Sequence, residues 1–353
     1  MKIYLTGSFR RTLMWATCMS VVSIFAHGRE APAVEKMECA GQFKFALPGP
    51  VEFALTQREA FLDCNGQDYI AFADESMPRE AAFALSRKVD ISRETSREDF
   101  TTLRAEALAM TQKDKKDLIR KGKNDIADLI KPFELGGPDA FAWSSAAGVE
   151  VFFYKGGHIY RFNAHSDGTQ KDEGARAKEF FANMKARKMF EVPSEKGICY
   201  PYSFLKTDKP LEYTAGVGMR LTEHPEVEIL VRDSEPLAPN NPMKMDPQAK
   251  IKFFMETLLT DTFSKIDYHW QLKPFVLAGS PGKAAFVNVR RGDKQNDVVF
   301  IASVPGVATK TGPARDLLLY VSRNASLAKG VPMSEPKFRE LAEAIAKSVT
   351  PLQ

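Results

Sequence analysis

The chain has 353 residues, a formal net charge of +4 and charges of both signs along its length. A composition of this kind gives no electrostatic reason to expect nucleic-acid binding. The length is more than one ordinary hydrophobic core fills, which predicts more than one domain.

Residues 1–28 read as an export signal. Lys2, Arg10 and Arg11 form a basic segment, an apolar stretch follows at 12–25, and Ala26-His27-Gly28 places small residues at the −3 and −1 positions of a signal peptidase. The apolar stretch is shorter than the ~20 residues that cross a bilayer. We therefore expect cleavage after Gly28 and a mature protein without a membrane span. Cleavage removes three basic residues and no acidic one, which leaves a mature charge of about +1.

The first half is predicted to begin with strands and to continue with helices and a hairpin. Ser96 before Glu98 and Asp99 is a capping-box arrangement, which predicts the start of a helix. The basic stretch 113–123 has Asp residues interleaved with Lys and Arg, so we interpret it as a solvated helix face. Gly156-Gly157 predicts the turn of a hairpin. The predicted strands are 43–47, 51–56, 69–72, 82–93, 141–143, 149–154 and 158–164, and further helices are 115–130 and 172–187.

The second half repeats this order. Asp246 as N-cap with Pro247 at the first helical position starts a helix well, and Ser334 is predicted to cap the last helix. The predicted strands are 200–205, 212–221, 227–231, 275–278, 284–290, 298–304 and 317–321. Both halves thus read as strands, a long helix, more strands and a closing helix.

This order favours an α+β fold of two similar domains, each a mainly antiparallel sheet with helices packed on one face. Residues 29–192 and 197–353 are the predicted domains, joined by a polar segment that contains Pro193 and Gly197. A duplication explains the repeated order, although such an order also arises independently.

Three cysteines remain after export: Cys39, Cys64 and Cys199. An oxidising compartment permits disulfides. Cys39 and Cys64 flank a predicted strand–turn–strand unit, so we expect them to pair. Cys199 is then left as a small buried apolar residue. Three free buried thiols are the alternative.

No catalytic motif is found. The chain lacks the His-Glu-x-x-His, Gly-x-Ser-x-Gly, P-loop and Gly-x-Gly-x-x-Gly patterns. Four histidines follow the signal, none of them at zinc-ligand spacing or near Cys199: His158, His165, His224 and His269. We interpret His158 and His165 as surface or cleft residues beside a hairpin, and Glu223-His224-Pro225-Glu226 as a turn rather than an acid–base pair. The prediction is no catalytic residue, no metal and no cofactor.

Short phrases open the two halves. The first contains Cys39, Gly41, Phe43, Leu47 and Pro48, and the second contains Gly197 and Cys199, with a His224-Pro225 turn following a strand. In this combination the chain resembles the immunity proteins that protect bacteria against lipase effectors of the type VI secretion system. Gln42 departs from the pattern, because many members have a basic residue there. These residues are structural in the family and are not known contacts.

The resemblance implies a periplasmic, two-domain, non-catalytic protein that binds a cognate phospholipase effector. It implies that the two domains grip the effector and either block its active site or hold its lid, and it identifies no contact residue. Loops at 156–157, 236–242 and 292–296 are places where a contact could lie. The alternatives are a periplasmic small-ligand-binding module and an envelope hydrolase with a dispersed active site.

Overall fold

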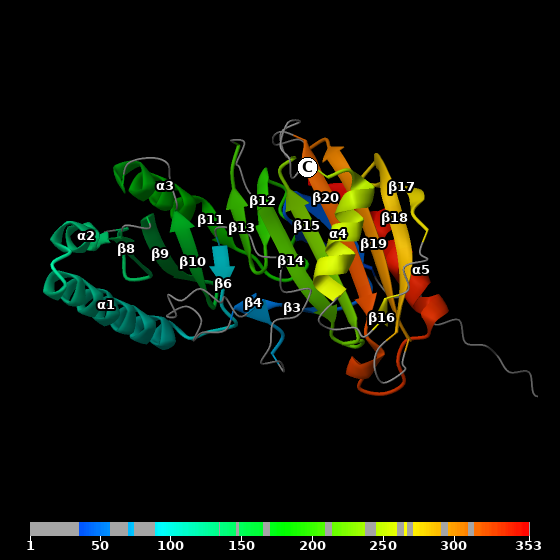
Figure 1. Ribbon diagram of the computed structural model, residues 1–353, viewed down its shortest axis with the longest axis horizontal. Coiled ribbons are helices and arrows are strands. Elements are labelled where there is room, and N and C mark those ends of the chain that lie inside the picture. Colours follow the sequence, from blue (N-terminus) through cyan, green and yellow to red (C-terminus); the bar gives the residue numbers. More distant parts are fainter. Residues whose placement is uncertain are drawn as a thin grey trace, which may run out of the picture. The chain divides into compact units, whose positions relative to one another are not determined.

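The first sheet has five antiparallel strands in the order β6-β10-β9-β8-β7 (Figure 1). The computed structural model describes residues 35–56, 70–73, 89–133, 135–145, 148–164, 170–208, 214–236, 245–259, 265–266, 271–290, 296–309 and 314–352. The strands of this sheet are β6 (Val89–Ile91), β7 (Lys131–Phe133), β8 (Ala140–Ser145), β9 (Gly148–Lys155) and β10 (His158–Ala164). Gly156 and Gly157 both have positive φ and form the predicted turn between β9 and β10.

Helices cover both faces of this sheet, not one face as expected. Helix α1 (Arg97–Arg120) packs on a cluster that contains Phe152, whereas helix α3 (Gln170–Asn183) places Phe181 against Phe153, with ring centroids 5.2 Å apart. Neighbouring residues of a strand point to opposite faces. The sheet therefore lies between α1 and α3.

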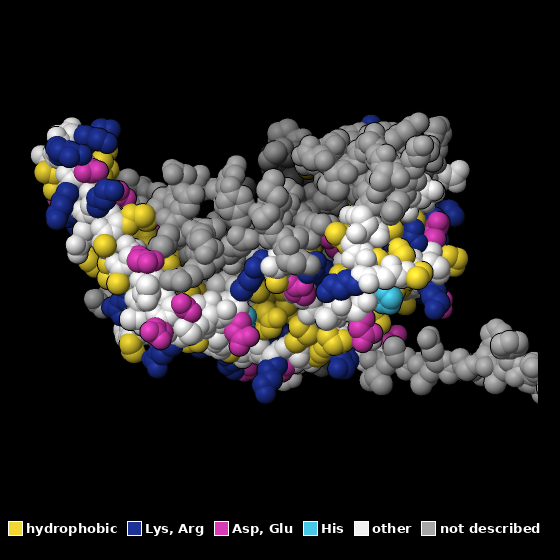
Figure 2. Space-filling view, turned by 90° about the horizontal axis from the view of Figure 1, so that it is seen from below, with side chains coloured by type: hydrophobic (Ala, Val, Ile, Leu, Met, Phe, Trp, Pro, Cys, Tyr) yellow, Lys and Arg dark blue, Asp and Glu magenta, His cyan; other side chains and the backbone are white. Residues whose placement is uncertain are grey.

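Helix α1 begins as predicted, with a capping box between Ser96 and Asp99. It runs on to Arg120, and the short helix α2 (Asn124–Leu129) follows it. Buried residues occur only in the first three turns of α1, and most residues at 113–123 are exposed. Figure 2 shows Lys and Arg side chains gathered at that end, in agreement with the predicted solvated face.

The second large sheet has eight antiparallel strands in the order β16-β18-β19-β20-β15-β14-β3, with β17 also paired to β18. Its strands are β3 (Val51–Phe53), β14 (Thr214–Leu221), β15 (Val227–Ser234), β16 (Lys265–Ile266), β17 (Lys273–Leu277), β18 (Ser280–Arg290), β19 (Asn296–Val307) and β20 (Arg315–Arg323). Helix α4 (Pro247–Leu259) shares a core cluster with Ile301, and helix α5 (Glu335–Ser348) shares another with Phe300. Both faces of this sheet are therefore covered as well. A short 3-10 helix spans Ala325–Leu327.

The first strands of the chain pair with strands from its second half. β3 pairs with β14, and β2 (Phe43–Leu47) lies between β1 (Lys36–Ala40) and the C-terminal β21 (Thr350–Pro351). A further small sheet has the order β11 (Met184–Ala186), β13 (Ser203–Lys206) and β12 (Gly197–Tyr200), and β4 (Leu55–Thr56) pairs with β5 (Ile70–Ala71). The α+β class with mainly antiparallel sheets is confirmed. The division at residues 192–197 stays a prediction.

None of the described helices is long and apolar enough to cross a membrane.

Candidate functional site

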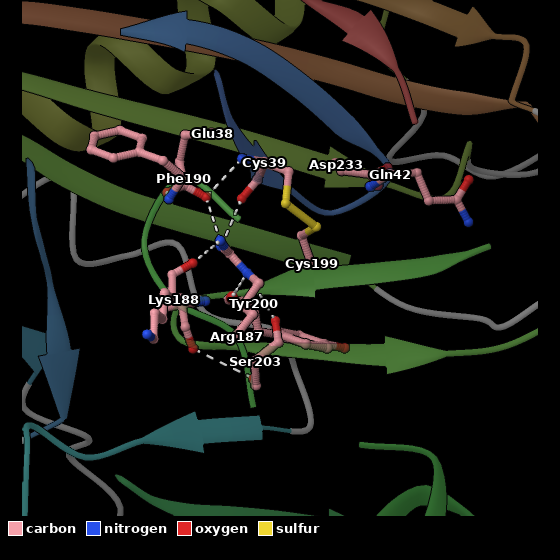
Figure 3. The surroundings of a disulfide bond; sticks show 11 residues. Glu38, Cys39, Gln42, Arg187, Lys188, Phe190, Cys199, Tyr200, Ser203 and Asp233 are labelled. Atoms are coloured by element: carbon pink, nitrogen blue, oxygen red, sulfur yellow. Dashed lines mark hydrogen bonds and ion pairs between the residues drawn. A yellow bond between two sulfur atoms is a disulfide. The ribbon is translucent and has the colours of Figure 1, made fainter. Parts of the chain in front are cut away.

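The two cysteine-containing phrases of the sequence meet near the end of β1 and within β12. Cys39 and Cys199 form a disulfide with their Cα atoms 5.8 Å apart (Figure 3). Beside it, the amide of Gly41 donates to the carbonyl of Cys199 at 2.9 Å, and the amide of Cys199 donates to the carbonyl of Gly41 at 2.8 Å. The bridge therefore reinforces a backbone pairing between the start and the middle of the chain.

The expected Cys39–Cys64 pair is wrong, because the sulfur of Cys39 is already bonded to that of Cys199. Cys64 itself lies outside the described residues. Cys199 is buried, as predicted, but it is half of a disulfide and not a free apolar residue. The error arose because Cys39 and Cys64 are close in sequence, while Cys199 becomes a neighbour only when β1 and β12 come together.

A buried ion pair lies beside the disulfide. Arg187 Nη1 is 2.6 Å from Glu38 Oε1, and both side chains are almost fully shielded from water. The guanidinium also donates to the carbonyls of Cys39, Tyr200 and Ser203 at 3.1–3.3 Å. Glu38 accepts from the amides of Cys39 and of Phe190, at 2.8 and 2.9 Å. These bonds offset the desolvation of both charges, so the pair ties β1 to the hairpin β12–β13.

A second buried ion pair explains the glycine of the first phrase. Asp233 accepts from the amide of Gln42 at 2.9 Å and from Arg315 Nε at 2.7 Å. Gly41 has φ +59°, and a Cβ at this position would come within 2.5 Å of Asp233 Oδ2. Only glycine fits both the backbone angle and the close approach. The turn between β1 and β2 is thus fastened to β15, which carries Asp233.

Tyr202 packs between the two large sheets. Its backbone has φ +56°, which is unusual for a residue with a side chain. Its ring stacks on that of His158 in β10, with centroids 4.2 Å apart, and lies edge-on to Phe53 in β3 at 5.2 Å. Tyr160 Oη donates to the Tyr202 carbonyl at 3.2 Å. One side chain therefore contacts both sheets.

His158 is buried, so its interpretation as a surface or cleft residue is wrong. The signal that was missed is the alternation of β10, which places it on the same face as the buried Tyr160. Burial lowers the pKa of His158, while its Nδ1 contact with the Ser92 carbonyl at 2.9 Å and the charge of Glu94 partly oppose this. Burial raises the pKa of Tyr202, and the nearby negative charges of Glu38, Glu52 and Glu94 add to the effect. Both shifts favour the neutral form of the ring.

The remaining motif residues described here lie in the core or in turns between strands. Phe43 and Leu47 lie in the core, and Pro48 is half-buried between β2 and β3. His224 and Pro225 lie in the turn between β14 and β15, where Glu226 accepts from the amide of Met333 at 2.9 Å and contacts His224 Nδ1 at 3.2 Å.

Of the loops suggested for contacts, Gly156 is exposed at the tip of its hairpin. Residues 237–242 and 292–295 lie outside the described part of the chain. His165 and His269 lie outside it too.

The geometry of this site suits a structural role better than a catalytic one. The charged groups at the disulfide are buried and paired with each other, and the cysteines are oxidised. Within the described ranges, no three His, Cys, Asp or Glu residues are grouped so that they could hold a metal ion. What the site does is join β1, β12, β13 and β15 into a single assembly.

No family model matches the chain, and no curated protein matches it. Several solved structures match its fold, and three of them are described here. The immunity protein TplEi of the type VI secretion system from Pseudomonas aeruginosa, complexed with "L" peptide, has a TM-score of 0.53 at 15% identity, over 91% of this chain and 99% of that chain. Its apo structure also has a TM-score of 0.53 at 15% identity, over 90% and 97%. A chain of the Tle4–Tli4 complex has a TM-score of 0.56 at 14% identity, over 91% and 99%. The resemblance seen in the sequence is thus confirmed at the level of the fold: over nine-tenths of its length the chain is similar to an immunity protein of the type VI secretion system.

Proposed function

We propose that this chain is a periplasmic immunity protein that binds and inhibits a cognate lipase effector of the type VI secretion system. The observation that carries the proposal is the shared fold with the immunity protein TplEi over 91% of this chain. The cysteine and glycine phrases add independent support, since they resemble the family that acts on lipase effectors. The same residues form the disulfide and the Gly41 turn.

In this proposal the chain has no catalysis of its own and inhibits by covering the active site of the effector. Inhibition by occlusion needs a large complementary surface of ~1,600 Å² with a few aromatic or Arg residues at its centre. Such a surface must be presented rigidly, because ordering it on binding costs affinity. The fastening of the sheets by the disulfide, the buried ion pairs and Tyr202 supports this role.

Export is part of the proposal. The predicted signal at residues 1–28 directs the chain out of the cytoplasm, and the Cys39–Cys199 disulfide fits an oxidising compartment. N-terminal sequencing of the protein from a periplasmic fraction is expected to begin at Arg29. A protein that begins at Met1 would contradict cleavage.

The test is co-purification with a lipase-like protein encoded beside the gene for this chain, with lipase activity measured with and without the chain. We expect a stable complex without lipase activity. No complex and no inhibition would overturn the proposal, and hydrolysis by the purified chain alone would favour an envelope hydrolase. A thermal shift with a small molecule and no protein partner would favour a ligand-binding module.

Occlusion is tested separately with a serine-directed fluorophosphonate probe. If the chain covers the active site, the probe labels the free effector but not the complex. An inhibited complex that is still labelled would keep the immunity function and replace occlusion by a held lid.

A further inference from the structure

Strand β17 lies at an edge of the eight-stranded sheet (Figure 1). In the described part of the chain it pairs only with β18. Ala278 and Gly279 have φ +52° and +77° and form a two-residue turn between these strands. In a hairpin with such a turn, the flanking Leu277 and Ser280 form a hydrogen-bonded pair.

In an antiparallel pair of strands, the residues direct their backbone groups alternately toward the partner strand and away from it. This alternation shows which backbone groups of β17 face β18 and which face outward. Lys273, Phe275 and Leu277 bond to β18, whereas Pro274 and Val276 direct their backbone groups away from the sheet. Pro274 has no N–H and loses nothing at such a position. The outer edge therefore presents the Pro274 carbonyl and both backbone groups of Val276. Unpaired groups of this kind are a template for a strand from another chain.

The side chains of this edge are unusually apolar for their exposure. Val276 is 62% exposed. Beside β17, on the face of the sheet opposite to the Val276 side chain, is a pocket of about 380 Å³ whose lining includes Phe275, Phe286 and Phe300. The rings of Phe286 and Phe300 lie 4.9 Å apart, and Phe275 meets Phe300 edge-on at 5.7 Å. An aromatic lining beside an open strand edge suits an apolar side chain that projects from an added strand.

Charges line the same pocket. The guanidinium of Arg339 in α5 stacks over the Phe286 ring at 4.5 Å and is held by Glu335 at 2.8 Å. Glu343 is paired with Lys347 at 2.9 Å. Lys273 also lines the pocket, and no ion pair of it is found among the described residues. The uncompensated charge is therefore positive, which is complementary to a carboxylate.

We propose that β17 and this pocket bind an extended segment of the effector. The segment adds as a strand along Pro274 and Val276, inserts an apolar or aromatic side chain among the three phenylalanines, and places a carboxylate near Lys273 and Arg339. This docking site rests on the function proposed above and identifies the part of the surface that binds the effector. A second copy of this chain is a poorer occupant, because it would bring the same positive charge to the edge.

The test compares the affinity of the effector, the lipase-like protein encoded beside the gene, for wild-type chain and for edge variants. Val276→Pro removes the outward N–H and leaves the bonds between β17 and β18 intact. Val276→Asp adds a charge at the edge, and Val331→Asp is its control at a residue that is 94% exposed on another loop. Arg339→Gln removes one of the two cations that line the pocket, and Lys337→Gln removes a cation from an exposed residue of α5 that does not line it. Thermal melting confirms that each variant is folded.

Residues that anchor an interface typically change affinity by at least about tenfold. We expect this loss for Val276→Pro, Val276→Asp and Arg339→Gln, and changes within about twofold for both controls. Amide exchange at Val276 is expected to slow in the wild-type complex. If wild type forms no complex, the proposed function fails. If wild type binds and the edge variants bind equally well without slowed exchange, the docking site is overturned. The docking site is also overturned if the free chain is a dimer, if Val276→Pro separates that dimer, and if the variant keeps its affinity for the effector. That result would identify a second copy of the chain as the occupant.

Discussion

The guanidinium of Arg187 contacts the carboxylate of Glu38 at 2.6 Å, and the contact is almost completely shielded from water. Glu38 lies in β1, close to the start of the predicted mature chain, while Arg187 follows β11. Removing one partner of a buried ion pair leaves a charge that nothing compensates. The pair should therefore be more important for stability than any exposed ion pair in the protein.

Arg187→Met is expected to lower the free energy of unfolding by about 3–5 kcal/mol, because Glu38 is left buried and ionised. The double variant Glu38→Gln/Arg187→Met should lose less, since both charges are gone. Urea unfolding followed by tryptophan fluorescence measures both changes.

The matched control is the exposed pair of Lys185 and Glu195, whose side chains are 52% and 37% exposed. Lys185→Ala is expected to cost less than about 1 kcal/mol. Equal costs for Arg187→Met and Lys185→Ala would contradict the assignment of Arg187 to a buried pair.

The disulfide gives a second prediction. Cys39→Ser or Cys199→Ser is expected to lower the free energy of unfolding by about 2–5 kcal/mol, because the bridge closes a loop that spans 160 residues of sequence and restricts the unfolded chain. Cys64→Ser is the matched control and should leave the bridge in place. Non-reducing peptide mapping is expected to find Cys39 linked to Cys199. A Cys39–Cys64 peptide would show that the bridge is assigned wrongly.

Elements with local signals could be predicted from the sequence. The Ser96 capping box, the Pro247 helix start and the Gly156-Gly157 hairpin are all present, because each depends on residues a few positions apart. The α+β class followed from the order of these elements. The His224-Pro225 turn was predictable for the same reason.

Relations between distant residues could not be predicted in this way. The pairing of β3 with β14 and the bond between Cys39 and Cys199 join segments more than 150 residues apart. A single sequence carries no local trace of such contacts. Helix periodicity shows which side of α1 or α3 is apolar but not which face of a sheet receives it, so the expectation of helices on one face was wrong. The outward direction of the Val276 backbone groups likewise depends on which strand lies at the edge of the sheet, and that depends on contacts between distant segments.

Gly41 gives a third prediction, with Gly122 as its control. Both have positive φ, but a Cβ at Gly122 meets nothing within 4 Å, whereas at Gly41 it would overlap the carboxylate of Asp233. Gly122→Ala is expected to cost about 1–2 kcal/mol for the backbone angle alone. Gly41→Ala should cost clearly more, because it also displaces Asp233 from Arg315. Thermal or urea unfolding of both variants measures the difference. Equal losses would show that Asp233 moves aside freely.

His158 gives a prediction for pH. Burial lowers its pKa in the folded protein from the ordinary value of 6.5. Between the two pKa values the unfolded chain binds more protons than the folded one, so protons favour unfolding in that range. Stability is therefore expected to fall as the pH drops through 6.5. Below the pKa that His158 has in the folded protein, this residue no longer contributes to the decrease.

The measurement is the free energy of unfolding at pH 7.5 and at pH 5.5 for wild type and for His158→Phe. Phenylalanine keeps a flat ring against Tyr202 but cannot titrate, so the decrease in stability at the lower pH should be smaller in the variant by up to about 1.4 kcal/mol per unit of pKa shift. The other titratable groups are present in both proteins, so the difference between them reports on His158. An NMR titration of the His158 imidazole tests the cause directly. A midpoint at or above 6.5 would mean that the Ser92 carbonyl and Glu94 outweigh burial, and the stability difference should then vanish or reverse.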